Sequence, residues 1–184
     1  VFKYQAFEDD TISWLYAMLG RSTFRVGEID KWQICPFLIG VAGCGKSTVC
    51  ALLKHFFEPR RVSTISSNME DKFGLASIWD SDICIATEVT KSFPLDRGVW
   101  QACVTGERVC VPRKYNDPKD VEWTVPFFLA GNEPPDWEDK SKSVARRMVP
   151  FYMRTRVKSS NPNLQSTLLD QAPLYLVRFV REYH

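Results

Sequence analysis

The residues with the clearest chemical meaning are glycines, a lysine and a serine in one short stretch. Gly40 is followed by four residues and then by Gly45-Lys46-Ser47. Glycines let the backbone turn tightly and direct successive N–H groups toward one point, and a helix N-terminus adds partial positive charge there. We expect Lys46 to contact the β- and γ-phosphates of a nucleotide, and the Ser47 hydroxyl to bind magnesium. The pattern predicts a nucleoside triphosphate site made by Gly40, Val41, Ala42, Gly43, Cys44, Gly45, Lys46, Ser47 and Thr48.

The segments on either side of this loop supply the secondary structure that it requires. Residues 34–39 form a short apolar run, interrupted only by Pro36, that predicts a buried strand. After the loop, apolar residues recur at the spacing of one helical face: Val49, Leu52, Leu53, Phe56 and Phe57. A strand, a glycine loop and a helix N-terminus in that order are the context of a phosphate-binding loop.

A carboxylate follows a second apolar run. Residues 83–86 predict another buried strand, which ends at Thr87-Glu88. Parallel α/β sheets bind their ligands at the carboxyl ends of strands, so this position corresponds to the Walker B motif. Glu88 is predicted to activate a water molecule or to hold magnesium through water. The alternative, a solvated carboxylate in a loop, is less favoured because a phosphate loop lies upstream.

Two further groups are candidates for contact with the phosphates. Residues 127–132 predict a buried strand that ends in Asn132, which either orients the attacking water or caps the turn before Pro134. Arg146 and Arg147 directly precede an apolar strand and must point in different directions. One of them is expected to be structural and the other to stabilise charge on a transferring phosphoryl group. Arg146 is favoured for the second role, because Arg147 adjoins the strand.

Residues 108–125 change to a two-residue period, which predicts a β-hairpin. Its tip is expected at residues 113–119, a turn-forming stretch with three cations and one aromatic residue. Cations beside an aromatic ring suit the backbone of a nucleic acid, and a charged, solvated hairpin is the alternative. The candidate DNA-binding residues are Arg113, Lys114, Tyr115 and Lys119.

Local signals also predict the elements at both ends of the chain. Residues 9–11 begin a helix that Gly20 is expected to close. Residues 62–65 predict a short strand, and residues 161–163 open a linker. A C-terminal helix is expected to begin at Pro173 and to bury Leu176, Phe179, Val180 and Tyr183. The expected organisation is an N-terminal helical segment (1–32), an ATPase core (33–158) and a C-terminal helical segment (159–184).

Composition limits the class of protein. The 184 residues are 45% hydrophobic and 13% aromatic, typical of one folded domain. The net charge is +2, so a nucleic-acid site must be local. The six cysteines show no Cys-x-x-Cys spacing, which disfavours zinc and predicts buried thiols in a reducing, intracellular compartment. No apolar run approaches the roughly 20 residues of a membrane span. The chain has no initiating Met and is expected to be a domain of a longer protein.

The order of these motifs resembles the superfamily 3 helicase domain, an AAA+ type ATPase, as in primase–helicases of large nucleocytoplasmic DNA viruses and related phage primases. The resemblance implies an α/β fold with a central, mostly parallel five-stranded sheet flanked by helices, plus an inserted β-hairpin. Cys44 and a single Walker B acid depart from the family pattern. The matching segments are 40–48 (Walker A), 68–75, 83–88 (Walker B), 105–115 (B′ region), 129–134 (motif C) and 146–151 (arginine finger region).

The resemblance implies a homo-hexameric ring that hydrolyses ATP with Mg²⁺ at subunit interfaces, where each site takes an arginine from the neighbouring subunit. The hairpins would line a channel that holds single-stranded DNA, and a primase domain would belong to the same longer chain. The expected role is to unwind viral DNA at its replication site in the host cell. The alternatives are a phosphate-loop small-molecule kinase and a non-unwinding AAA+ initiator or assembly module. DNA-stimulated ATP hydrolysis separates a helicase from the kinase, and strand displacement separates it from the assembly module.

Overall fold

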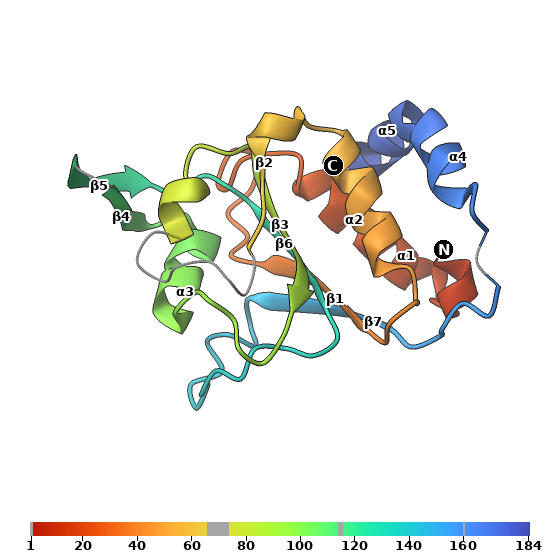
Figure 1. The fold of residues 1–184 in the computed structure, drawn as a ribbon, viewed down its shortest axis with the longest axis horizontal. Helices are drawn as coiled ribbons and strands as arrows, with labels where there is room; N and C mark the ends of the chain where they lie inside the picture. Colours follow the sequence, from red (N-terminus) through yellow and green to blue (C-terminus); the bar gives the residue numbers. More distant parts are fainter. Residues whose placement is uncertain (1, 66–73, 114–115, 160) are drawn as a thin grey trace.

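Five parallel strands form the centre of the protein (Figure 1). The computed structural model describes residues 2–65, 74–113, 116–159 and 161–184. The strand order is β2-β3-β6-β1-β7, and every neighbouring pair is parallel, which confirms the predicted sheet. All five strands therefore end at one edge of the sheet. The strands are β1 (Cys35–Gly40), β2 (Val62–Ser63), β3 (Ile83–Val89), β6 (Phe127–Gly131) and β7 (Met148–Met153).

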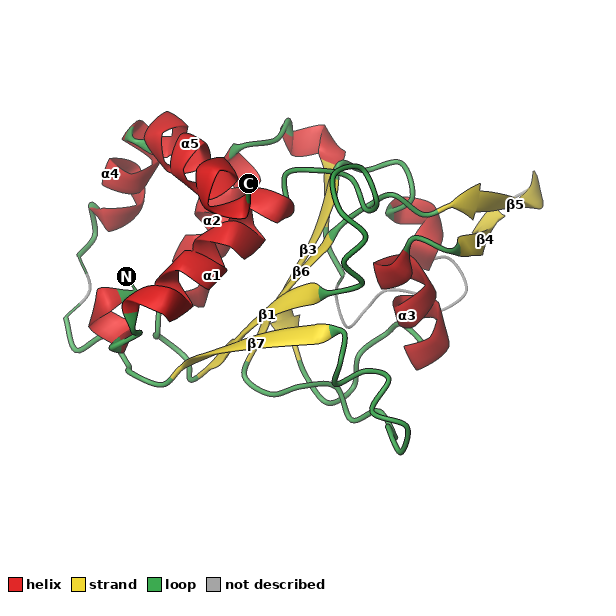
Figure 2. Cartoon of the chain, turned by 180° about the vertical axis from the view of Figure 1, so that it is seen from behind, coloured by secondary structure: helices red, strands yellow, loops and turns green. Residues whose placement is uncertain are grey.

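Helices cover both faces of this sheet (Figures 1 and 2). On one side lie α1, α2, α4 and α5, and on the other lie α3 and the hairpin. Strand residues alternate between the two cores: Leu38 of β1 belongs to the first, whereas Phe37 and Ile39 belong to the second. Burial on both faces explains why β1 and β6 are apolar throughout, whereas β7, at the edge of the sheet, includes exposed residues. The helices are α1 (Asp9–Arg21), α2 (Lys46–His55), α3 (Arg97–Thr105), α4 (Leu164–Asp170) and α5 (Ala172–Tyr183), with 3-10 turns η1 (Lys3–Gln5), η2 (Pro59–Arg61) and η3 (Gly74–Ser77).

Helices α1 and α5 pack closely together, and this packing requires a glycine at position 20. The prediction that Gly20 closes the first helix is wrong: it lies within α1, and Ser22 is the C-cap. A Cβ atom at position 20 would lie 2.2 Å from the Phe179 carbonyl oxygen in α5. Only glycine allows the two backbones to approach this closely.

A buried ion pair joins the same helices to the connection that precedes β1. Arg21 donates hydrogen bonds to Asp30 at 2.8 Å and to the Trp32 carbonyl at 2.6 Å, and Tyr183 of α5 donates to Asp30. Burial alone would raise the pKa of Asp30, but the hydrogen bonds from Arg21 and Tyr183 hold this pKa below its usual value. The polar connection is therefore fixed to α1 and to α5.

The hairpin consists of β4 (Arg108–Arg113) and β5 (Asn116–Glu122), which project from the rest of the molecule (Figure 1). Val109 and Val111 are buried, as the alternation predicts. The predicted tip, residues 113–119, is longer than the turn in the structure, because Arg113 already pairs with Asn116. Lys119 lies within β5, paired with Val111, and its Nζ lies 4.7 Å from the centre of the Trp79 ring. Lys114 and Tyr115 lie outside the described residues.

Several element boundaries differ from the prediction. Strand β2 ends at Ser63, and β3 continues to Val89, so Glu88 lies within the strand. Phe56 and Phe57 follow the end of α2 and are partly buried. Helix α4 occupies part of the expected linker, and α3, whose N-cap Asp96 accepts a 2.7 Å hydrogen bond from the Gly98 N–H, was not predicted. Residues 66–73, most of one segment in the family resemblance, lie outside the described residues.

The C-terminal helix begins at Ala172, one residue before the predicted Pro173. Of its four expected core residues, Phe179 is buried, with 1% of its surface exposed. Leu176, Val180 and Tyr183 are partly buried. Phe179 is the position at which this helix meets Gly20 of α1.

The contact at Gly20 gives a stability prediction. We expect Gly20→Ala to lower the free energy of unfolding by about 1–3 kcal/mol, because a backbone carbonyl cannot move aside without separating α1 from α5. Gly98→Ala in α3 is the matched control, since its Cβ meets only the end of the Asp96 side chain at 3.1 Å. Urea unfolding of both variants measures the difference. Equal stability of Gly20→Ala and wild type would contradict the close backbone approach.

Candidate nucleotide-binding site

The loop between β1 and α2 has the backbone geometry of an anion-binding turn. Gly43 and Gly45 have φ values of 77° and 103°, in the left-handed region that favours glycine. A Cβ atom at Gly40 would lie 2.1 Å from the Met153 carbonyl oxygen of β7. Each of the three glycines therefore has its own geometric reason: two turn the loop, and one lets β7 pass close to its start.

The hydrogen bonds of the loop leave its N–H groups free. The carbonyl of Gly43 accepts a hydrogen bond from the Val157 N–H at 3.0 Å, and that of Gly45 accepts one from the Val49 N–H at 3.3 Å. The Cys44 carbonyl accepts one from the Gln5 side chain at 2.9 Å. In contrast, no backbone N–H of residues 42–48 donates a hydrogen bond to any residue that the structure describes. Unused amides at a helix N-terminus form a site for a phosphate group.

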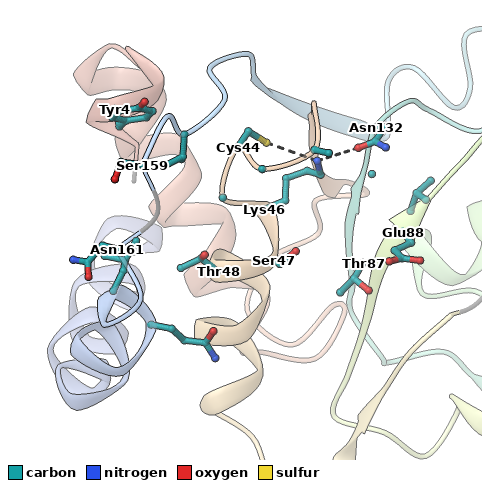
Figure 3. A pocket seen from close by; sticks show the side chains of 18 of the residues that line it. Tyr4, Cys44, Lys46, Ser47, Thr48, Thr87, Glu88, Asn132, Ser159 and Asn161 are labelled. Carbon is teal, nitrogen blue, oxygen red and sulfur yellow. Dashed lines mark hydrogen bonds between the residues drawn. The ribbon is translucent and has the colours of Figure 1, made fainter.

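Lys46 lies over this loop and connects it to the end of β6 (Figure 3). Its ammonium group donates to the carbonyls of Gly40 and Val41, the latter at 3.1 Å. It also donates to Oδ1 of Asn132 at 3.1 Å, although 86 positions separate the two residues in the sequence. Phosphate oxygens are stronger acceptors than neutral carbonyls, so a bound nucleotide would replace the carbonyl contacts.

Strand pairing explains why Asn132 and Glu88 reach the same site. Strand β6 lies between β1 and β3, and Gly131 pairs with both Ile39 and Val89. A Cβ atom at Gly131 would lie 2.2 Å from the Val89 carbonyl oxygen, so the strand ends converge closely here. Asn132 follows directly. The sheet therefore places the amide between the phosphate loop and the carboxylate of Glu88.

A cavity of about 810 Å³ extends along this edge of the sheet. One end is lined by the loop with Glu88 and Asn132, as Figure 3 shows. Tyr4 from η1 and the residues that enter α4 line the other end. The volume is in the range of sites that hold a nucleotide-sized ligand. The residues of this second end are Tyr4, Val157, Ser159, Asn161, Pro162, Leu164 and Gln165.

The protein groups suit a magnesium ion that also binds phosphate. No group of three or more His, Cys, Asp and Glu residues in the described part of the chain is arranged to hold a metal. Ser47 and Glu88 both line the cavity and offer one hydroxyl and one carboxylate. Mg²⁺ takes few protein ligands and completes its shell with water and substrate phosphates, so this donor set is compatible with it.

Arg146 and Arg147 lie at the opposite edge of the sheet from the phosphate loop. They precede Met148, which pairs with Cys35 at the start of β1, whereas Gly40 at its end pairs with Met153. A strand of this length separates the two edges by roughly 17–20 Å. The structure therefore does not bring either arginine to the phosphate loop of its own chain.

The two arginines differ in their surroundings. Arg147 is buried, with 9% of its surface exposed, and its Nη1 donates to the Ser143 carbonyl at 2.9 Å. Arg146 is exposed. Its segment is fixed by Asp139, which accepts hydrogen bonds from the Val144 and Ala145 N–H groups at 3.0 and 2.9 Å. Burial tends to raise the pKa of Asp139, but these hydrogen bonds hold the pKa below its usual value.

Three residues at the site have no motif that marks them in the sequence. Tyr4 lines the cavity, and Gln5 binds the loop at Cys44. The side chain of Arg156 approaches the Cα of Gly43, since a Cβ atom there would lie 3.6 Å from its Cγ and Nε atoms. All three lie far along the chain from the loop. Local sequence patterns carry no signal for such contacts.

The comparisons with known proteins identify the family. A family model described as "Family of unknown function (DUF5906)" matches residues 38–147, more than half of the chain. The chain therefore belongs to this family. No curated protein matches it.

Solved structures of other proteins align with most of this chain. An apo structure of the NrS-1 C-terminal region (A form) aligns with a TM-score of 0.66 and 19% identity, over 97% of this chain and 42% of that one. A second apo structure, of the NrS-1 C-terminal region (305–718), aligns with a TM-score of 0.66 and 18% identity, over 94% of this chain and 42% of that one. A JCV helicase structure aligns with a TM-score of 0.47 at 16% identity, over 94% of this chain and 48% of that one. The chain spans less than half the length of each of these structures.

Within the described residues, no helix has the length and the apolar character that a membrane crossing requires.

The predicted burial of thiols is confirmed for Cys35, Cys44, Cys50, Cys84 and Cys103, and Cys110 on β4 is exposed. Burial raises the pKa of Cys50 to about 12 and that of Cys84 to about 12.

These thiols give a test of the loop geometry. Native protein treated with iodoacetamide at pH 8 is expected to gain one adduct, at Cys110, because buried neutral thiols react slowly. Denatured protein should gain six, the number of cysteines. Peptide mass spectrometry locates the adducts, and Cys110→Ser is the control that should abolish native labelling. Rapid native labelling of Cys44 would show that the loop side chain points outward.

Proposed function

We propose that this chain is an ATP-hydrolysing domain of a DNA helicase of the superfamily 3, AAA+ type. The observation that supports it best is the contact of Lys46 with Asn132 above a loop of free amides, with Glu88 in the same cavity. Free loop amides and a lysine suit the phosphates of a nucleotide, and hydrolysis needs an acceptor for the proton of water. The motif order that resembles superfamily 3 supports the helicase assignment.

Each residue of the site has a distinct role in this proposal. The loop amides and Lys46 bind the β- and γ-phosphates, while Asn132 orients the attacking water. Glu88 accepts the proton of that water at its carboxylate, which is exposed in the cavity. Ser47 and Glu88 would hold Mg²⁺, which when bound neutralises charge on the phosphates.

Assembly supplies the remaining part of the site. Because Arg146 is exposed at the far edge of the sheet, it reaches a phosphate only in another copy of the chain. We infer a homo-hexameric ring in which Arg146 stabilises the transition state bound by its neighbour. Buried Arg147 supports the segment locally.

The projecting hairpin is proposed to bind single-stranded DNA in the ring. Arg113 and Lys119 are exposed, and Lys119 lies beside the Trp79 ring, so a cation and an aromatic surface are close together. Lys114 and Tyr115 are proposed to take part as well. In a longer chain, the domain would act with a primase at the intracellular site of viral DNA replication.

The first test measures hydrolysis and unwinding in the same preparation. Wild type is expected to hydrolyse ATP with Mg²⁺, faster with single-stranded DNA, and to displace an annealed strand. Lys46→Ala should reduce turnover by about 10²–10³-fold because it removes the main phosphate cation. Glu88→Gln should bind ATP normally but hydrolyse it about 10²–10⁴-fold more slowly, since an amide accepts no proton.

Lys54→Ala is the matched control, a lysine of the same helix that does not line the cavity. It should retain wild-type turnover. ATP hydrolysis without DNA stimulation or strand displacement would favour the kinase or the assembly module. Unchanged turnover of Lys46→Ala would remove the nucleotide site from this loop.

A subunit-mixing experiment tests the arginine. Arg146→Ala and Lys46→Ala are each expected to be inactive alone, since an arginine finger contributes about 10³–10⁵-fold in rate. A mixture should regain activity, because some interfaces then join an intact loop to an intact arginine. Arg60→Ala, an exposed arginine paired with Glu58, should stay fully active. Absence of rescue in a preparation shown to exchange subunits would contradict action across an interface.

A further inference from the structure

The buried side chain of Gln5 connects the N-terminal turn to the phosphate loop. Gln5 is 6% exposed, which is unusual for a glutamine. Its Nε2 donates to the Cys44 carbonyl at 2.9 Å and to the Thr155 carbonyl at 2.7 Å. Its Oε1 accepts from the Thr155 N–H at 2.8 Å. The amide thus bridges the loop and the segment that follows β7.

The contact with Cys44 determines where a neighbouring amide points. The carbonyl of Cys44 and the N–H of Gly45 belong to one planar peptide unit and point in opposite directions. When Gln5 holds this carbonyl, the Gly45 N–H must face the other way. The Val157 N–H holds the Gly43 carbonyl at 3.0 Å and fixes the Cys44 N–H by the same geometry.

Without such a contact, this peptide unit would turn easily. Gly43 and Gly45 lie on either side of Cys44, and glycine adopts left- and right-handed conformations at similar cost. The flexibility that allows the loop to form therefore also allows its amides to turn away from a phosphate. An external hydrogen bond to the Cys44 carbonyl removes that freedom before the ligand binds.

We propose that Gln5 is a positioning residue that orients the amides of the phosphate loop for binding a polyphosphate. This rests on the proposed function, because it assumes that the loop binds the phosphates of a nucleotide. Gln5 does not line the cavity and acts only through the loop backbone. Its effect is expected on the phosphate-dependent part of binding.

The experiment compares ligands with and without phosphates by isothermal titration calorimetry of the full chain. The probes are ATP, inorganic tripolyphosphate and adenosine. Gln5→Met keeps the size of the side chain but loses both donors. It should weaken ATP and tripolyphosphate about tenfold, as loss of preorganisation predicts, and leave adenosine binding unchanged. Gln33→Met, an exposed glutamine before β1, is the matched control and should bind all three as wild type.

A second variant distinguishes positioning from a general loss of stability. Gln5→Glu has no donor when ionised, but regains one O–H donor when protonated. Burial raises the pKa of such a carboxyl above its usual value of about 4.3. Relative to wild type and Gln33→Glu at each pH, its affinity for tripolyphosphate should recover as the pH falls from 8 to 5. A purely structural defect would give no such recovery.

The outcomes separate the two proposals. If wild type binds ATP and tripolyphosphate in a Lys46-dependent way, and folded Gln5→Met binds them equally well, the role of Gln5 is overturned. The role of Gln5 is also overturned if the affinity of Gln5→Glu for tripolyphosphate, relative to wild type, stays the same between pH 8 and pH 5. If wild type binds neither probe, the proposed function itself fails, and this inference fails with it.

Discussion

The common direction of the five strands is the constraint on which the rest of the structure depends. Strand β1 pairs in parallel with β6 and β7, and β3 pairs in parallel with β6. Every strand then delivers its last residue to the same edge, where Lys46, Glu88 and Asn132 meet. The same rule sends Arg146, which lies two residues before β7, to the opposite edge. The parallel strand order thus explains both why Lys46, Glu88 and Asn132 lie at one edge and why Arg146 lies at the other.

Two apolar layers hold this sheet in place, and each has a different task. The layer with α1, α2 and α5 fixes helix α2, which follows the phosphate loop. Within this layer, the close packing of α1 on α5 depends on the absence of a side chain at Gly20. The layer with α3 supports the hairpin and the segment of Arg146, since Gln101 of α3 donates a 2.7 Å hydrogen bond to Ser143. The candidate nucleotide site and the proposed subunit contact of Arg146 are therefore supported by opposite faces of one sheet.

The phosphate loop combines flexible residues with contacts that remove their flexibility. Glycines permit its turns, while the carbonyls of Gly43 and Cys44 are fixed by Val157 and Gln5. Satisfied carbonyls and free amides give the loop a positive electrostatic surface before any ligand is present. A loop backbone that is held in this way before a ligand binds loses less conformational freedom on binding.

The sequence by itself determined the local features: the strand, loop and helix around Lys46, the apolar strands before Glu88 and Asn132, and the alternating arms of the hairpin. These follow from periodicity and from residue types that act within a few positions. Only the tertiary structure decided which distant backbones touch. Local signals place Gly20 at a helix end, because its partner, Phe179, lies far along the chain. Local signals likewise place Lys119 at the hairpin tip and do not mark Gln5, because strand register and long-range hydrogen bonds leave no periodic pattern in the sequence.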